Sequence, residues 1–393
     1  PILFIRKASG ALRPVNNYSS GKNDSLNSRL LIPRFPCYPI RTILGNISAG
    51  ISKLRRNFPD SPIVFLSIDI KNAFFSLSIR EGHRDLTSFI YSDKQFRYVR
   101  MSQGLSSSPG VFNYFINLVL SDLPGQDEKY CLFNYFDDFF IVTTEKHHNF
   151  AAETLLQRLT EHNLIISLEK CAFYERSTKF LGYILSPSGV SPDPKKVQAL
   201  LELDYPKTLK EAQQCLGLLN FYTRNIKNLS VNLSALSKEI GKGKEFKLND
   251  TIRKGIDAIK SEISKGTTTK HLEYPDINTN ERLFVACDTS LTRTGAIIGN
   301  LTLKNDVISN IRIAAYASKL LTEQETLLSA RGRELIGISL GLKAFKDLIP
   351  KSIKFLVFCD HKSLENVHHS TNLKTSGSTR VRLAYSELCE FPN

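Results

Sequence analysis

The stretch from Phe133 to Val142 constrains this chain most, because two aromatic and apolar arms meet there at adjacent carboxylates, Asp137 and Asp138. Neighbouring side chains of a straight strand point to opposite faces, so both aspartates reach one site only at a tight bend between two strands. The stretch therefore predicts a hairpin with acids at its tip. Buried like charges need a counter-charge, and carboxylate oxygens suit a divalent metal ion. An ordinary acidic turn is the alternative, since Asp is a favoured turn residue.

The composition is that of a globular protein that binds a polyanion. The 393 residues are 41% hydrophobic and 23% charged, which is enough for two or three domains with cores. Lys and Arg number 52 against 38 Asp and Glu, a formal net charge of +14. Because the basic residues are interleaved with aromatic ones, nucleic acid is favoured over an anionic membrane. No apolar run approaches the roughly 20 residues of a spanning helix, so we expect no membrane partner.

The cysteines and the first residue indicate the setting. Seven cysteines, an odd number, form no Cys-x-x-Cys pair, which predicts a reducing, intracellular setting with neither a zinc knuckle nor a disulfide framework. The chain starts with Pro, not Met, which suggests a fragment or a piece of a longer polyprotein.

The N-terminal segment predicts a basic hairpin. Ser9-Gly10 is a turn signal between two apolar runs, 2–5 and 12–15. The hairpin would carry three cations, Arg6, Lys7 and Arg13. They form either a solvated face or a clamp on phosphates.

Asp69 ends a nearly continuous apolar run, 63–70, which is typical of a strand buried on both faces. The acid is either a strand-end cap or the companion of the hairpin pair. Farther on, we expect Ser108 to cap a helix that Pro109 begins. The glycine and serines before that helix offer backbone amides to an anion or a sugar-phosphate chain.

The middle of the chain predicts a helix over 148–163, a single strand over 180–185 and a separate helical unit over 193–247. Adjacent His147 and His148 are expected to be exposed to solvent, because no third metal ligand stands at a suitable spacing.

A second set of acids lies in the last third. Buried strands predicted at 283–288 and 353–360 end in Asp288 and Asp360, and a helix over 330–348 places Glu334 at the edge of its apolar face. Alone, each acid is a cap or a surface residue. Together, in a strand-strand-strand-helix-strand order, they form a second candidate metal site. Asp288 also begins a motif similar to the Asp-Thr-Gly of aspartic proteases, but the glycine is absent.

Several short motifs follow one another along the chain: Asp69 with Phe74, Gln103-Gly104 with Ser108-Pro109, Tyr135-Phe136-Asp137-Asp138, Lys170-Cys171 and Phe180-Leu181-Gly182-Tyr183. Taken together, they resemble the ordered motifs of a reverse transcriptase. The blocks at 216–222, 316–320 and 360–364 resemble those of gypsy-type LTR retrotransposon (Metaviridae-like) Pol polyproteins, with an RNase H domain behind the polymerase.

The resemblance covers essentially the whole chain and implies an α+β fold. A right-hand polymerase of fingers, palm and thumb would be followed by an α/β RNase H-like domain that is truncated at its C-terminus. Residues 1–186 would form fingers and palm, 187–270 the helical thumb and connector, and 271–393 the incomplete RNase H-like domain.

The resemblance also implies roles for single residues. Asp69, Asp137 and Asp138 would hold two Mg²⁺ ions, with Mn²⁺ as the alternative, for nucleotidyl transfer. Lys170 would donate a proton to pyrophosphate. Residues expected to contact the nucleotide are Arg6, Lys7, Arg13, Phe74, Gln103 and Gly104. Residues expected to contact the primer are Tyr135, Phe136, Phe180, Leu181, Gly182 and Tyr183. Three RNase H carboxylates, which would hold ions for cutting the RNA strand of a hybrid, are matched by Asp288, Glu334 and Asp360.

Phe74 would act as a steric gate against ribonucleotides, and its alternative role is core packing. The chain also departs from the family. Phe136 stands where a smaller residue is more common, and Asn17-Tyr18-Ser19 stands where Asp-Tyr-Arg is usual, which removes a template-contacting arginine. The family's fourth RNase H acid falls beyond Asn393, so we expect weak or no RNase H cleavage.

We therefore predict an RNA- and DNA-directed DNA polymerase with an appended RNase H-like domain. The implied partners are an RNA template, a DNA primer, an RNA–DNA hybrid and dNTPs, and a homodimer is left open. The implied location is intracellular, either in cytoplasmic virus-like particles of a retroelement or in the nucleus. The alternative is a non-catalytic nucleic-acid-binding remnant or a structural subunit, against which the three intact aspartates Asp69, Asp137 and Asp138 argue.

Overall fold

The computed structural model describes residues 2–6, 10, 12–20, 24–30, 39–125, 127–241, 246–266, 269–274, 279–305, 307–349, 353–364 and 378–391. The chain forms two compact units, the first from Pro1–Pro39 and Leu54–Arg176 and the second from Ile40–Lys53 and Ser177–Asn393. None of the described helices combines the length and the apolar character that crossing a bilayer requires.

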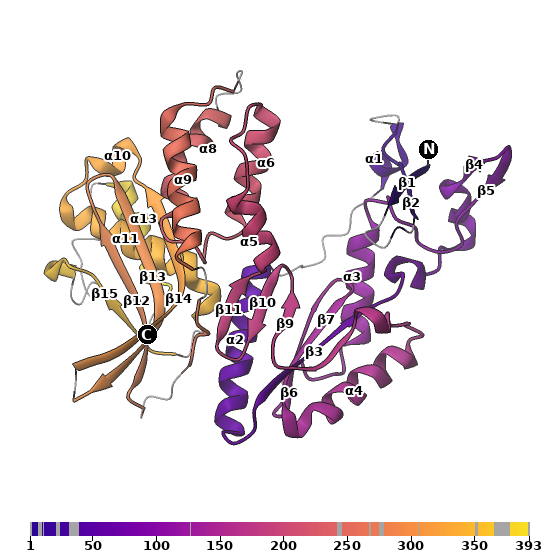
Figure 1. Ribbon diagram of the computed structural model, residues 1–393, viewed down its shortest axis with the longest axis horizontal. Coiled ribbons are helices and arrows are strands. Elements are labelled where there is room, and N and C mark those ends of the chain that lie inside the picture. The colour runs from indigo at the N-terminus through magenta and orange to yellow at the C-terminus, as the bar shows by residue number, and fades with distance from the viewer. Residues whose placement is uncertain are drawn as a thin grey trace. The chain divides into compact units, whose positions relative to one another are not determined.

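A four-stranded sheet in the order β6-β7-β3-β8 is the centre of the first unit (Figure 1). β3 (Ile63–Asp69) pairs antiparallel with β7 (Asp138–Thr144) and with β8 (Ala172–Glu175). β6 (Tyr130–Tyr135) pairs with the other edge of β7. The predicted buried strand and the predicted hairpin are therefore both confirmed.

Helices α3 (Ser108–Val119) and α4 (His148–Glu161) share one core with this sheet. Its buried members include Leu66, Ile68, Phe112, Ile116, Phe139, Ile141, Leu155 and Leu159. The helix cap predicted at Ser108 is wrong, because Ser107 occupies the N-cap and the buried Ser108 hydroxyl donates to Ser102 O at 3.0 Å instead. The exposed position predicted for His148 is also wrong, since its side chain packs into the unit with only 5% exposed.

The rest of the first unit consists of short elements. They are β1 (Ile2–Arg6), β2 (Leu12–Asn16), α1 (Leu26–Arg29), η2 (Ala73–Ser76), η3 (Glu81–Thr87), β4 (Phe89–Tyr91), β5 (Lys94–Phe96), η4 (Glu145–His147) and η5 (Leu168–Lys170). β1 and β2 form the predicted N-terminal hairpin. Helix α2 (Ile40–Asn57) contributes residues to both units.

The second unit begins with a small antiparallel sheet, in which β9 (Thr178–Phe180), β10 (Tyr183–Ser186) and β11 (Gly189–Pro192) have the order β11-β10-β9. The single strand predicted over 180–185 is wrong. A two-residue turn interrupts it, where Leu181 has φ of 50° and Gly182 has φ of 84°. Two positive φ values in succession match the twist of a tight hairpin, but only the glycine signals them.

The helices predicted over 193–247 are present in the described part of that range, whereas their separation into a unit of their own stays a prediction. They are α5 (Pro194–Leu201), α6 (Leu209–Asn220), α7 (Leu229–Asn232) and α8 (Ser234–Gly241), and α9 (Asp250–Ser264) follows. Side chains of Asp193, Thr208 and Asn249 cap α5, α6 and α9 by accepting bonds from backbone amides, as residues of these types do at helix starts.

The last part of the second unit is a four-stranded sheet in the order β14-β13-β12-β15. β12 (Glu281–Thr289), β13 (Arg293–Lys304) and β14 (Val307–Leu320) are antiparallel, and β15 (Phe355–Phe358) runs parallel to β12. The remaining elements here are α10 (Glu323–Thr326), α11 (Ala330–Phe345), η6 (Lys346–Leu348), η7 (Lys362–Leu364) and α13 (Thr379–Leu388). This is the predicted strand-strand-strand-helix-strand order. The predicted burial of the last strand is wrong, because Val357 is 42% exposed on a strand at the end of the sheet order.

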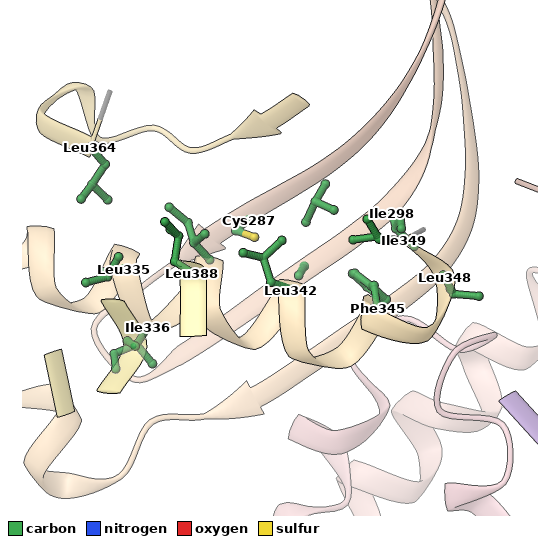
Figure 2. Packing of buried hydrophobic residues seen from close by; sticks show 14 of the residues in the cluster. Cys287, Ile298, Leu335, Ile336, Leu342, Phe345, Leu348, Ile349, Leu364 and Leu388 are labelled. Carbon is green, nitrogen blue, oxygen red and sulfur yellow. The ribbon is translucent and has the colours of Figure 1, made fainter. Parts of the chain in front are cut away.

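Helix α11 lies against the sheet, and Figure 2 shows Leu335, Leu342 and Phe345 on the helix side of a core that also holds Cys287 and Ile298. Glycines of α11 allow the helix to approach the sheet closely. A Cβ at Gly337 would collide with the Thr289 hydroxyl, and one at Gly341 would lie 2.9 Å from Cys287 Sγ. This tight packing holds the start of α11, including Glu334, beside the end of β12.

Candidate active site

The bend between β6 and β7 consists of Phe136 and Asp137, and Tyr135 pairs with Asp138 across it. Phe136 has φ of 56°, a left-handed conformation that is costly for a side chain of this size. Its ring contacts the Tyr135 ring edge to face, with centroids 5.0 Å apart. A strained aromatic residue thus turns the chain at the acids, where a glycine would be the easier choice.

The bend brings Asp137 and Asp138 to Asp69. Asp69, the last residue of β3, is the direct cross-strand partner of Asp138 in β7. The amide of Ile70 donates to Asp137 O at 3.2 Å, which fixes the turn against the end of β3. Directly opposed residues have Cβ atoms about 5 Å apart, so the carboxylates share one small region.

Lys170 belongs to the same cluster. Its Nζ donates to Asp69 Oδ1 at 2.9 Å, and the amide of Ser167 donates to Asp69 O at 2.8 Å. The lysine side chain is 57% exposed and the aspartate 18%. The Lys170 amine therefore remains accessible to an anion bound at this site while it is paired with the mostly covered Asp69 carboxylate.

The electrostatics of the cluster leave a surplus of negative charge. Burial, followed by the charges of Asp137 and Asp69, raises the pKa of Asp138 to about 6, although Lys170 opposes this. Burial also raises the pKa of Asp137, and Lys170 and Arg13 oppose that rise. The cluster therefore fits divalent cations, because these ions would neutralise the negative charge of the three aspartates that Lys170 alone leaves uncompensated.

The charge of Arg13 acts on Asp137, so the basic hairpin contributes to the electrostatics of the acids. Arg6 lies on the partner strand, where it pairs with Leu12 and is exposed to solvent. Lys7 lies outside the described residues.

Gln103 and Gly104 are held by the N-terminal segment. The amide of Asn16 donates to Gln103 O at 3.4 Å, and Asn27 Nδ2 donates to Gly104 O at 2.9 Å. Gly104 has φ of 104°, and a Cβ there would collide with Asn16 O. This position therefore requires glycine.

The sequence did not identify the polar network behind this loop. Asn16 Nδ2 donates to the Tyr18 hydroxyl at 3.1 Å, and that hydroxyl shares a 2.9 Å hydrogen bond with Ser102 Oγ. Asn27 Oδ1 also accepts from the amide of Ser106 at 2.9 Å. The Asn- and Ser-rich composition of 16–27 was the available signal, but it indicates only a loop.

Phe74 packs against the core of the first unit, which was one of the two roles predicted for it. Its ring meets the buried Phe112 ring edge to face at 5.8 Å, and the residue is half-buried. Its partial exposure is compatible with a gate as well, and that role stays a prediction.

The residues expected to contact the primer belong to different compact units. Tyr135 and Phe136 flank the acids in the first unit, whereas Phe180–Tyr183 form the β9–β10 turn in the second. Tyr183 stacks on Phe221 with centroids 5.2 Å apart and donates its hydroxyl to Phe221 O at 3.0 Å.

The second acidic site assembles in part. Donor atoms of Glu334, Cys359 and Asp360 lie within 4.8 Å of one another, the sole such group of potential metal ligands that the described residues form. Burial, then the charges of Asp360 and Asp288, raise the pKa of Glu334. Asp288 is not a member of the group, and Cys359, which is, was not predicted. Burial raises the pKa of the Cys359 thiol to about 11.

Comparison with known proteins supports two domains. Residues 5–185 match the family model of reverse transcriptase (RNA-dependent DNA polymerase), and residues 278–388 match that of the RNase H-like domain found in reverse transcriptase. The predicted domain borders at 186 and 270 stay predictions.

The curated relatives are transposon polyproteins. The transposon Tf2-3 and Tf2-7 polyproteins of Schizosaccharomyces pombe are each 26% identical to this chain over 366 residues. These alignments cover 93% of this chain, which spans about a quarter (25%) of each polyprotein.

Solved structures share the fold. The foamy viral protease-reverse transcriptase dRH in complex with ds DNA has a TM-score of 0.78 at 22% identity, with 100% of this chain and 63% of that chain covered. The foamy viral protease-reverse transcriptase in complex with RNA/DNA hybrid has a TM-score of 0.71 at 20% identity, with 100% and 49% covered. The predicted mixed fold is confirmed. The chain contains a reverse transcriptase domain followed by an RNase H-like domain, and it is homologous to the Tf2 transposon polyproteins.

Proposed function

We propose that this chain copies a primed RNA or DNA template into DNA, with Asp69, Asp137 and Asp138 holding two Mg²⁺ ions beside the growing end. The convergence of three carboxylates with a surplus of negative charge carries the proposal. Reverse transcriptases in general use divalent metal ions, and carboxylate oxygens suit Mg²⁺. When bound, the two ions would lower the pKa of the primer 3′-hydroxyl and neutralise charge on the triphosphate.

The chain's own residues would bind and orient the reactants. Asp69 and Asp138 would orient the ions from paired strands, and Asp137 would do so from the bend. Lys170 would protonate the leaving pyrophosphate, and its 2.9 Å bond to Asp69 supports this role. Arg13 would attract the triphosphate, since its charge already acts on Asp137.

The partners follow from the same proposal. The solved relatives are complexes with ds DNA and with RNA/DNA hybrid, and a net charge of +14 suits both polyanions. We include dNTPs as substrates. The location proposed is intracellular, in cytoplasmic virus-like particles or in the nucleus, because the curated relatives are transposon polyproteins.

RNase H cleavage is proposed to be weak or absent. The two-metal cut of a hybrid needs carboxylates gathered around both ions. Glu334 and Asp360 are close together and the charge of Asp288 acts on Glu334, but the thiol of Cys359 lies among these carboxylates.

Primer extension tests the polymerase proposal. A labelled DNA primer on an RNA template is incubated with Mg²⁺, dNTPs and either the wild type or Asp137→Asn. We expect extension by the wild type and at most trace extension by the variant. Asp60→Asn, at an exposed aspartate in the turn before β3, is the matched control and should extend like the wild type.

The competing function is binding without copying. Fluorescence anisotropy with the same hybrid separates the two. Hybrid binding by both proteins, with wild-type extension no greater than that of Asp137→Asn, would establish the binding remnant and overturn the polymerase.

A further inference from the structure

The turn between β9 and β10 carries an ammonium group at the point where its glycine lacks a side chain. Gly182 has φ of 84°, and a Cβ there would lie 2.6 Å from Lys196 Nζ. Lys196 belongs to α5, which Asp193 caps. The amide of Asp193 donates to Gly182 O at 3.1 Å, which holds the start of α5 beside the turn. The lysine amine therefore occupies the place that a side chain at Gly182 would fill.

An aromatic ring from a third element supports the ammonium group. Lys196 Nζ lies over the Phe221 ring, 5.5 Å from its centroid, a distance at which the face of an aromatic ring attracts a cation. Phe221 follows α6, and its ring is held by stacking on Tyr183 of β10. Contacts with the turn and with Phe221 thus set the position of Lys196, in addition to its own helix.

The acid at the start of α5 does not offset the charge of Lys196. Asp193 forms an ion pair with Lys179 of β9 at 3.1 Å, whereas none of the ion pairs between described residues involves Lys196. The amide of Lys195, and then the charges of Lys179 and Lys196, hold the pKa of Asp193 below its ordinary value. One ionised carboxylate thus faces two cations. Because Lys196 is exposed, a positive charge remains at the surface of the turn.

We propose that Lys196 Nζ binds a backbone phosphate of the primer strand at the β9–β10 turn. The inference rests on the proposed function, because it needs a primed template as the partner, and it adds a binding residue from outside the turn. An exposed ammonium group suits a phosphate oxygen, since the two form a charge-assisted hydrogen bond. A phosphate contact carries no base information. Lys196 would therefore hold the strand at the turn whatever its sequence.

Lys195 supplies a matched control. It is the neighbouring lysine of α5 and is also exposed. Successive residues of a helix point about 100° apart, and the atoms nearest to a Cβ at Gly182 belong to Lys196 and Phe221. Lys195→Gln thus removes the same charge from the same helix and leaves the ammonium group at the turn in place.

Methylphosphonate scanning of the primer tests the contact. In a labelled DNA primer on an RNA template, one phosphate at a time is replaced by an uncharged methylphosphonate, and the affinity of the full chain is measured by fluorescence anisotropy at several salt concentrations. Lys196→Gln should weaken hybrid binding several-fold and lower the slope of log affinity against log salt by about 1. One methylphosphonate should weaken wild-type binding to a similar extent and have no further effect on Lys196→Gln. Lys195→Gln should respond to that methylphosphonate as the wild type does, and Lys196→Arg should keep the wild-type salt slope.

Two results would overturn the proposal. One is an equal loss of affinity in Lys195→Gln and Lys196→Gln with the same salt slope, which would indicate a general effect of charge. The other is a scan in which every methylphosphonate weakens Lys196→Gln as much as the wild type. Primer extension by the wild type separates this inference from the proposed function, because extension without the coupling would refute the Lys196 contact alone, and coupling without extension would refute the polymerase alone. Circular dichroism of every variant verifies that the fold is intact.

Discussion

Replacing Asp138 by Asn should stabilise the metal-free protein near pH 8 while abolishing DNA synthesis. The carboxylate is opposed across the strands by Asp69 and follows Asp137 in the chain. Asn has nearly the same shape but carries no charge, so the substitution removes like-charge repulsion and the cost of burying an ion.

The size of the effect follows from the pKa. Burial and the two neighbouring carboxylates raise the pKa of Asp138 from 3.8 to about 6. A rise of about two pKa units corresponds to about 3 kcal/mol, and partial exposure to solvent reduces this to about 1–2 kcal/mol. Because the folded state holds the proton more tightly, the stabilisation by protonated Asp138 is fully present below about pH 4 and lost as the pH rises to about 6.

The assay is denaturant unfolding in EDTA at several pH values, with hydrogen exchange of the β7 peptides to localise the change. Asp138→Asn should gain about 1–2 kcal/mol over the wild type at pH 8 and little or nothing at pH 4. Added Mg²⁺ should stabilise the wild type more than the variant, because ligands that bind the folded state stabilise it. Asp60→Asn should show neither effect.

Two results would refute this reasoning. One is a loss of stability in Asp138→Asn of the same size at both pH values, which would indicate a structural role for the ionised carboxylate. The other is equal stabilisation of both proteins by Mg²⁺, which would place the ion elsewhere.

Three further predictions concern other parts of the chain. Phe74→Val should raise incorporation of ribonucleotides relative to deoxynucleotides in single-nucleotide assays. The control is Phe75→Val, at a half-buried neighbour that packs against Tyr98, and it should leave that ratio unchanged. The same ratio in Phe74→Val as in the wild type would contradict the gate. Gly104→Ala should weaken dNTP binding and cost about 1–3 kcal/mol, because φ of 104° is strained for alanine and its Cβ meets Asn16 O; an unchanged Tm and KM would contradict this. Cleavage of an RNA–DNA hybrid should be weak, and strong cleavage abolished by Asp288→Asn would contradict that expectation.

The central features of the fold could be predicted because local chemistry agrees with the final structure. The run before Asp69 is apolar at nearly every position, as a strand in the middle of a sheet requires, and β3 has neighbours on both sides. Adjacent aspartates between two apolar arms predicted the bend, and the structure turns there.

Predictions failed where a distant partner decides the local structure. The turn at Leu181 needs a positive φ, and a leucine in the sequence gives no sign of one. Packing of the nearby Tyr183 on Phe221, a residue distant in sequence, supports this turn. His148 is buried beneath Tyr174, whose ring meets it edge to face at 5.2 Å, a contact between residues far apart in sequence.

The second acidic site shows the same limit. The sequence placed Asp288, Glu334 and Asp360 near one another from strand ends and helix periodicity. It could not show that Cys359, one residue before Asp360, turns its thiol toward Glu334, because that depends on how α11 packs against the sheet. A cysteine inside an apolar run is more often a core residue than a ligand.

The most direct test of the account asks whether Asp69, Asp137 and Asp138 work as one catalytic unit. Single-turnover nucleotide incorporation is measured for the three single Asp→Asn variants and for the triple variant, with hybrid binding measured in parallel. Residues that act together show non-additive losses, so each single variant should lose nearly as much activity as the triple variant while still binding the hybrid. Near wild-type incorporation in any single variant, or losses that simply add up in the triple variant, would contradict a shared metal site at the β6–β7 bend.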